Sequence, residues 1–268
     1  NTTGTYNTAV GALALDASTT ANSGTAIGYN ALGANTTGQS NTAVGSLALD
    51  AATTADQNTA IGYNALTATT DGGANTAVGS EAMAANTTGA SNTAVGYLAL
   101  DANTTASYNV AVGRAALGAN TTGANNVAVG YTALAANTTA SNNTAVGYTA
   151  GSAITTGVEN TLIGYQSGDA LSTGGNNVAV GRGSLTAATT GDHSVAIGSL
   201  ALQSVTTAEG NVAIGRLALQ DNTAANNTAV GYDVLKENTT GASNVAVGYA
   251  ALDANTTGNY NVAIGDNS

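Results

Sequence analysis

Residues 92–108 read NTAVGYLALDANTTASY, and the rest of the 268-residue chain repeats this stretch. A Gly that follows Val or Ile recurs at sixteen positions, which are Gly11, Gly28, Gly45, Gly62, Gly79, Gly96, Gly113, Gly130, Gly147, Gly164, Gly181, Gly198, Gly215, Gly231, Gly248 and Gly265. The step between them is always the same, except that the step from Gly215 to Gly231 is one residue shorter. A fixed period below about 30 residues is typical of a solenoid, in which each coil buries its apolar side against neighbouring coils. We therefore expect residues 1–268 to form one repetitive segment without separate domains, cut within a repeat at both ends.

The composition predicts a thin core and argues against nucleic-acid binding and a membrane-spanning segment. The apolar residues, 43% of the chain, are mostly Ala, Val and Leu, and Phe, Trp and Pro are absent, so we expect a core one side chain deep. Fifteen acidic and four basic residues give a net charge of −11, which argues against binding nucleic acid through its phosphates. No apolar run is long enough to span a bilayer. The absence of Cys leaves the redox compartment undetermined.

One coil is best described by numbering from its Gly as position zero. Position −1 is always Val or Ile, position −3 is always Thr or Val, and position −2 is Ala in every coil except that of Leu162. This alternation predicts a short strand with one bulky face and one small face. A second short strand is predicted over positions +1 to +6, followed by a turn of the type Asn-Thr-Thr-Gly. In-register pairing of successive coils, about 4.8 Å apart, would make a parallel β-solenoid on the order of 75 Å long.

Two further patterns predict contacts between coils. Position −4 is Asn in all coils except those of Gly24 and Ser194, which predicts a ladder of stacked amides. Position +4 is Leu or Met, except at Gly151 and Gly168, and those two coils carry Ile154 and Leu171 at +7, where Asn is the commonest residue. An apolar side chain lost at +4 thus returns at +7. We therefore expect both positions to border the same internal volume.

The string around the repeated Gly resembles the Ser-Val-Ala-Ile-Gly motif of YadA-like head repeats, which belong to trimeric autotransporter adhesins. Residues 194–198 match that motif, residues 126–130, 177–181, 244–248 and 261–265 come close to it, and the resemblance covers all sixteen coils. It implies a left-handed β-roll, a homotrimer and a role in adhesion at the cell surface. Similar repeats occur in phage tail fibres. The coil of this chain is longer than the usual head repeat of that family, and no neck, stalk or membrane anchor is found in this sequence.

Position +1 carries a row of Tyr and Arg side chains that we single out as a possible surface-binding ladder. Its members, called the Tyr/Arg row below, are Tyr29, Tyr63, Tyr97, Arg114, Tyr131, Tyr148, Tyr165, Arg182, Arg216, Tyr232 and Tyr249. Tyr and Arg are enriched at interface hot spots, which favours a binding face. A stacked ladder that only stabilises the sheet is the competing interpretation, and we favour it over the binding face. Ala at −2 and Gly at zero form a smooth row of small residues on which another chain is expected to pack.

Other polar positions give weaker signals. Thr pairs at +8 and +9 resemble the Thr ranks of ice-binding solenoids, but adjacent residues at a corner are better explained by turn chemistry. Aspartates that share position +5 are two or more coils apart, too far to share a metal ion; these are Asp16, Asp50, Asp101, Asp169 and Asp253. Asn-Thr-Thr turns match the glycosylation signal only formally. These begin at Asn35, Asn86, Asn103, Asn120, Asn137, Asn238 and Asn255.

The sequence as a whole predicts a structural protein. His193 is the single His and falls in a loop, the chain has no Cys, and every segment is accounted for by the repeat. We therefore expect no enzyme activity, no catalytic residue, no cofactor and no metal site. The expected function is a stiff extracellular fibre or adhesin segment, on a cell surface or a virion, that associates with copies of itself and contacts a host or environmental surface. The alternatives are a phage tail-fibre shaft, a self-assembling filament subunit and an ice-binding solenoid.

Overall fold

The computed structural model describes residues 2–268, and none of these residues is helical. The chain divides into two compact units, Asn1–Thr139 and Ala140–Ser268. The strands of the first unit are β1 (Thr8–Val10), β2 (Thr25–Ile27), β3 (Thr42–Val44), β4 (Thr59–Ile61), β5 (Thr76–Val78), β6 (Thr93–Val95), β7 (Val110–Val112) and β8 (Val127–Val129). The strands of the second unit are β9 (Thr144–Val146), β10 (Thr161–Ile163), β11 (Val178–Val180), β12 (Val195–Ile197), β13 (Val212–Ile214), β14 (Thr228–Val230), β15 (Val245–Val247) and β16 (Val262–Ile264).

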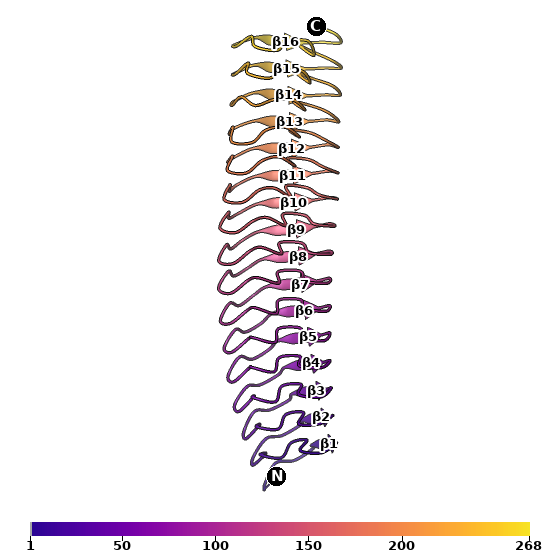
Figure 1. Cartoon of the computed structure of the whole chain (residues 1–268), viewed down its shortest axis with the longest axis vertical. Helices are drawn as coiled ribbons and strands as arrows, with labels where there is room; N and C mark the ends of the chain where they lie inside the picture. Colours follow the sequence, from indigo (N-terminus) through magenta and orange to yellow (C-terminus); the bar gives the residue numbers. More distant parts are fainter. Residues whose placement is uncertain (1) are drawn as a thin grey trace. The chain divides into compact units, whose positions relative to one another are not determined.

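Both units are parallel β-solenoids, as the sequence predicts. Within each unit the strands stack in sequence order, one per coil (Figure 1). Equivalent residues face each other without any shift, so that Ala94 pairs with Ala111 and Val95 with Val112. The single shorter coil keeps this register, because Val212 still pairs with Thr228. The missing residue therefore falls in the loop before Asn227, where its loss does not disturb the sheet.

The second strand predicted over positions +1 to +6 is wrong. These residues form consecutive turns in which positions +2 and +4 have a left-handed backbone, as at Leu98 (φ 56°) and Leu100 (φ 55°). The backbone of this segment is nevertheless paired between coils: the Leu100 N–H donates to the Ala116 carbonyl of the following coil, and the Leu98 N–H donates to the Ser80 carbonyl of the preceding one. Pairing between coils thus satisfies the backbone without an extended strand.

The Gly at position zero is required by the stacking. Gly96 has φ 137°, and a Cβ added there would lie 2.5 Å from the carbonyl oxygen of Gly113 in the next coil. Any side chain at this position would force the coils apart. The bend at Gly then carries the chain from the strand to position +1.

The core is one side chain deep, as the composition predicts. Its fully buried members in a typical coil are Ala94 at −2, Ala99 at +3 and Leu100 at +4. The β-branched residues at −3 and −1 point outward instead, and Val95 is 37% exposed. Because a coil this narrow has room only for small residues on the inner side of its strand, the large side chain comes from the turn at +4.

The predicted amide ladder at position −4 is confirmed and is buried. Asn58 illustrates it: its backbone N–H and its Nδ2 both donate to Oδ1 of Asn41, at 2.9 and 3.3 Å, and its Nδ2 also donates to the Gly72 carbonyl. A second ladder, which the sequence analysis did not predict, runs along position +7. There Nδ2 of Asn103 donates to Oδ1 of Asn86 at 2.8 Å. The amides therefore join neighbouring coils on the inside of the fold.

The predicted exchange between positions +4 and +7 is also confirmed. Gly151 and Gly168 keep the left-handed φ of the leucines they replace, 58° and 57°, while Ile154 and Leu171 are fully buried. Leu162, the exception at −2, completes the repacking, because a Cβ on Gly168 would lie 2.8 Å from its Cδ2.

Candidate binding surfaces

The Tyr/Arg row lies on the surface in both units. In the first unit the side chains of Tyr29, Tyr63, Tyr97 and Tyr131 are between 42 and 54% exposed. The Arg114 guanidinium lies between two of these rings, with Cζ 5.8 Å from the centroid of Tyr97 and 5.4 Å from that of Tyr131. Its Nη1 also donates to the Tyr131 hydroxyl at 3.1 Å. Arg114 is thus held by two cation–π contacts and a hydrogen bond.

In the second unit the same position forms stacked pairs. The rings of Tyr148 and Tyr165 lie 5.3 Å apart and nearly parallel, as do those of Tyr232 and Tyr249 at 5.5 Å. Arg216 covers the Tyr232 ring and donates to its hydroxyl at 2.6 Å. The side chains of the row therefore contact one another between neighbouring coils, and the row also presents ring edges, hydroxyls and guanidinium groups to solvent.

The strand face is a second exposed surface and corrects one prediction. Ala at −2 is fully buried from Ala26 to Ala246, so the row of small residues is unavailable to another chain. The outward face consists instead of Thr or Val at −3 and Val or Ile at −1. We call these two rows the strand face. Ile27, Ile61 and Ile163 on it are 39 to 40% exposed. Alternation predicted the two faces correctly but could not tell which one points inward.

The Thr pairs lie at the corner of the coil, as predicted, but their hydroxyls connect neighbouring coils. The hydroxyl at +8 donates to the carbonyl of the equivalent residue in the next coil, as from Thr87 Oγ1 to Thr104 at 3.0 Å. Its neighbour Thr88 at +9 is exposed. The Asn that begins the same turn is fully buried in six of the seven matches to the glycosylation signal and half-buried at Asn255. The folded chain therefore shields these amides.

Two aspartates at position +5 are perturbed by their surroundings. Partial burial raises the pKa of Asp101, and the negative charge of Glu81 adds a smaller increase. Burial likewise raises the pKa of Asp169, whose Oδ1 has no hydrogen-bond partner. Asp50 instead accepts a hydrogen bond from Thr67 Oγ1 at 2.8 Å. These carboxylates occur singly along the row.

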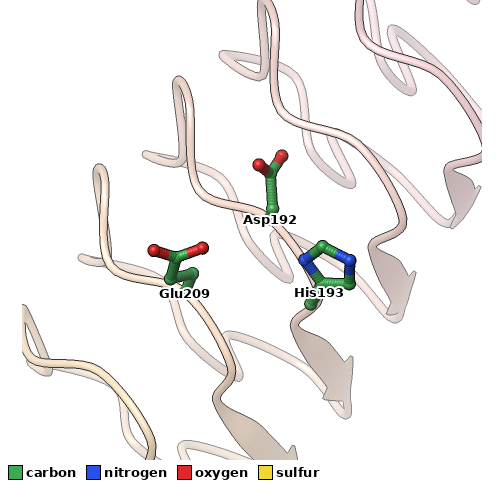
Figure 2. A group of neighbouring side chains, drawn as sticks. All are labelled: Asp192, His193 and Glu209. Carbon is green, nitrogen blue, oxygen red and sulfur yellow. The ribbon is translucent and has the colours of Figure 1, made fainter.

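One cluster of possible metal ligands was missed by the sequence analysis. Figure 2 shows Asp192, His193 and Glu209, whose ligand atoms all lie within 4.8 Å of one another. Asp192 and Glu209 share position −6 of neighbouring coils, so the repeat numbering contained the signal. His193 and Glu209 are exposed, and Oδ1 of Asp192 accepts a hydrogen bond from the Gly175 N–H at 2.6 Å. The cluster lies on an open corner of the coil and is not an enclosed metal centre.

A small hollow lies beside the row in the second unit. It has a volume of about 100 Å³ and lies between Tyr165, Arg182 and Leu200, with Gly183 at position +2 among its lining residues. Pockets for small-molecule ligands are usually about 300–1,000 Å³, so this one is too small to hold such a ligand. The exposed rows are the candidate functional surfaces.

Comparison with protein families, with characterised proteins and with solved structures gives no significant match to this chain. The resemblance to YadA-like head repeats therefore rests on the quoted motif alone. Residues 2–268 contain no helix that is long and apolar enough to cross a membrane.

Proposed function

We propose that this chain is a structural segment of an extracellular fibre, on a cell surface or a virion, in which three parallel copies pack through the strand face. The Tyr/Arg row then stays on the outside for attachment to a surface. The resemblance to YadA-like head repeats supports a trimer, and because similar repeats occur in phage tail fibres, the proposal covers adhesins and phage fibres alike. In this role the chain acts as a rigid support, and its repeated surface positions bind a target through many weak contacts at once.

The observation that carries the proposal is the exposed strand face. It is uncharged, and it is lined by β-branched side chains in every coil. Val or Ile at −1 forms a continuous apolar row along this face, and exposed apolar surface marks interaction sites on soluble proteins. Its rows repeat at the spacing of the coils, about 4.8 Å. A partner that matches such a repeat over many coils must have the same repeat, and a second copy of this chain does.

The buried ladders favour a stiff segment. Each coil of a unit is joined to the next by backbone hydrogen bonds around most of its circumference and by amides on the inside. Bending a unit would break several of these bonds at once. A spacer that holds an attachment surface at a distance needs this property.

Light scattering on the segment at several concentrations tests the proposal. We expect a stable trimer, and a shift to monomer when Val95→Lys and Val112→Lys place like charges opposite each other on the strand face. The matched control carries Thr88→Lys and Thr105→Lys on the exposed corner and should remain trimeric. A monomeric wild-type segment at all concentrations would contradict the proposal, and so would growth to large species, which would indicate a filament subunit.

Ice binding is the second candidate, and one observation favours it. Position −3 is Thr in the first six strands, from Thr8 to Thr93, so a row of hydroxyls lies beside a row of Val or Ile methyl groups on a parallel sheet. This candidate requires the strand face to be free. Thermal hysteresis by a monomeric segment, lost in the Val95→Lys and Val112→Lys variant, would establish it in place of the fibre.

A further inference from the structure

The first unit contains two gaps in the Tyr/Arg row that resemble the place where Arg114 lies. Tyr97 and Tyr131 are two coils apart, and Arg114 of the coil between them places its guanidinium about midway between the two rings. Tyr63 and Tyr97 are also two coils apart, with Ser80 between them, and Tyr29 and Tyr63 flank Ser46 in the same way. We call these two gaps the Tyr-Ser-Tyr slots.

The geometry of the slots follows from the strand register. Strands β4, β5 and β6 pair without a shift, as do β6, β7 and β8, so Tyr63 and Tyr97 are related in the same way as Tyr97 and Tyr131. Tyr rings of adjacent coils already stack at 5.3 Å and leave no gap. Rings two coils apart leave room for one planar group, which Arg114 supplies in one case. The short side chains of Ser46 and Ser80 do not fill the other two.

The charge around the slots favours a cation. The chain carries a net charge of −11. Glu81 follows Ser80 directly, so an acidic residue adjoins the second slot, and its backbone N–H donates to the Tyr63 carbonyl at 2.8 Å. Tyr97 already receives the Arg114 guanidinium on one ring face. Its other face is on the side of the Ser80 coil.

We propose that the two Tyr-Ser-Tyr slots bind arginine side chains of a basic peptide segment. The guanidinium groups would enter between Tyr29 and Tyr63 and between Tyr63 and Tyr97, in the manner of Arg114. The proposal deepens the attachment role of the Tyr/Arg row under the proposed function and rests on it. It identifies the partner as a protein that exposes arginines.

The spacing of the slots selects the sequence of that segment. Their centres are two coils apart, about 9.6 Å. Arginines at positions i and i+3 of a polyproline II helix lie on one face, about 9.3 Å apart. In a β-strand the same two residues point to opposite faces. The slots therefore fit Arg-X-X-Arg in the polyproline II conformation.

The test measures binding of a fluorescent peptide with the repeat Arg-Pro-Pro to the whole segment by anisotropy. Replacing Arg by Lys in the peptide should weaken binding by about tenfold or more, because an ammonium cannot stack in a planar slot. Ser80→Arg should fill one slot from within, as Arg114 does, and Tyr63→Ala should remove the ring that both slots share. Ser80→Arg should weaken binding because one of the two contacts is lost, and Tyr63→Ala should weaken it further because neither slot remains.

Thr88→Arg is the matched control, since it adds the same charge on a different corner and should reduce binding only slightly. Equal binding of the Lys peptide, or equal losses in Ser80→Arg and Thr88→Arg, would overturn the proposal and leave only general attraction of cations. Circular dichroism of each variant establishes that the fold is intact. The assay does not depend on the number of chains in the assembly, so a failure of the trimer and a failure of the slots are distinguishable.

Discussion

Position +4 places a buried leucine on a left-handed backbone, as in Leu100 and Leu117. Such a conformation costs roughly 1–2 kcal/mol for a residue with a side chain. Burying a leucine side chain contributes about 1.5–3 kcal/mol, which offsets that cost. Gly151 and Gly168 avoid the strain but lose the side chain, and this explains why apolar residues return at Ile154 and Leu171. At position +4, a leucine therefore strains the backbone but fills the core, whereas a glycine relieves the strain and leaves the core to be filled from position +7.

The ladder at position +7 contains a defect that can be repaired. Oδ1 of Asn35 is buried without a partner, because the next coil carries Ala52 where another Asn would donate. Ala52→Asn should supply that hydrogen bond and raise stability by about 1 kcal/mol, measured as a higher thermal midpoint. Ala188→Asn is the matched control. It lies between Leu171 and Val205, so its amide would be buried unpaired and should cost about 1–3 kcal/mol.

The raised pKa of Asp101 predicts a dependence on pH. Burial makes the folded chain hold this proton more tightly than the unfolded chain does. Stability is therefore lost as the pH rises from the unfolded value, about 3.9, through the folded pKa. Asp101→Asn should be more stable than wild type at pH 7, and this advantage should vanish near pH 3, where the carboxyl group is protonated in both states. An equal advantage at both pH values would mean that ionisation is not its cause.

At the scale of the element, three residues of one coil form a single packing unit. Leu162 and Leu171 fill the volume that Gly168 leaves. Gly168→Leu should overpack this coil at a cost of about 1–3 kcal/mol, and Leu162→Ala should leave a cavity at a cost of about 2–5 kcal/mol. The double variant should cost at least about 1 kcal/mol less than the sum, because each change relieves the other. Thermal midpoints of the four proteins measure this coupling, and strict additivity would disprove it.

The element scale also separates what sequence could predict from what it could not. The strand at −3 to −1, the amide ladder and the exchange between +4 and +7 follow from residues that repeat in register. The second strand was predicted wrongly because a Leu at +4 does not indicate a left-handed backbone. The only sign of that backbone in the sequence was the Gly that replaces Leu at +4 in two coils. The sequence could not show which face of the strand points into the core, because Ala94 and Val95 are both residues that cores contain. The structure decides it, since the inside of the coil is too narrow for valine at this position.

At the scale of the whole molecule, the exposed rows of each unit depend on stacking. Asp192 and Glu209 are one full repeat apart in the sequence, and Ser80 has no evident role until its neighbours Tyr63 and Tyr97 are placed two coils apart. Candidate sites of this kind are invisible to motif searches, which look for residues close in sequence. Numbering every residue by its position in the coil recovers them.

The central claim is that the strand face joins copies of this chain with equivalent coils opposite each other. The chain has no Cys, so one Cys introduced at Val95 tests the claim by oxidative cross-linking. We expect efficient covalent dimers from Val95→Cys at low protein concentration, and none from Thr88→Cys on the exposed corner. Equal cross-linking of the two variants, or none with Val95→Cys, would contradict it.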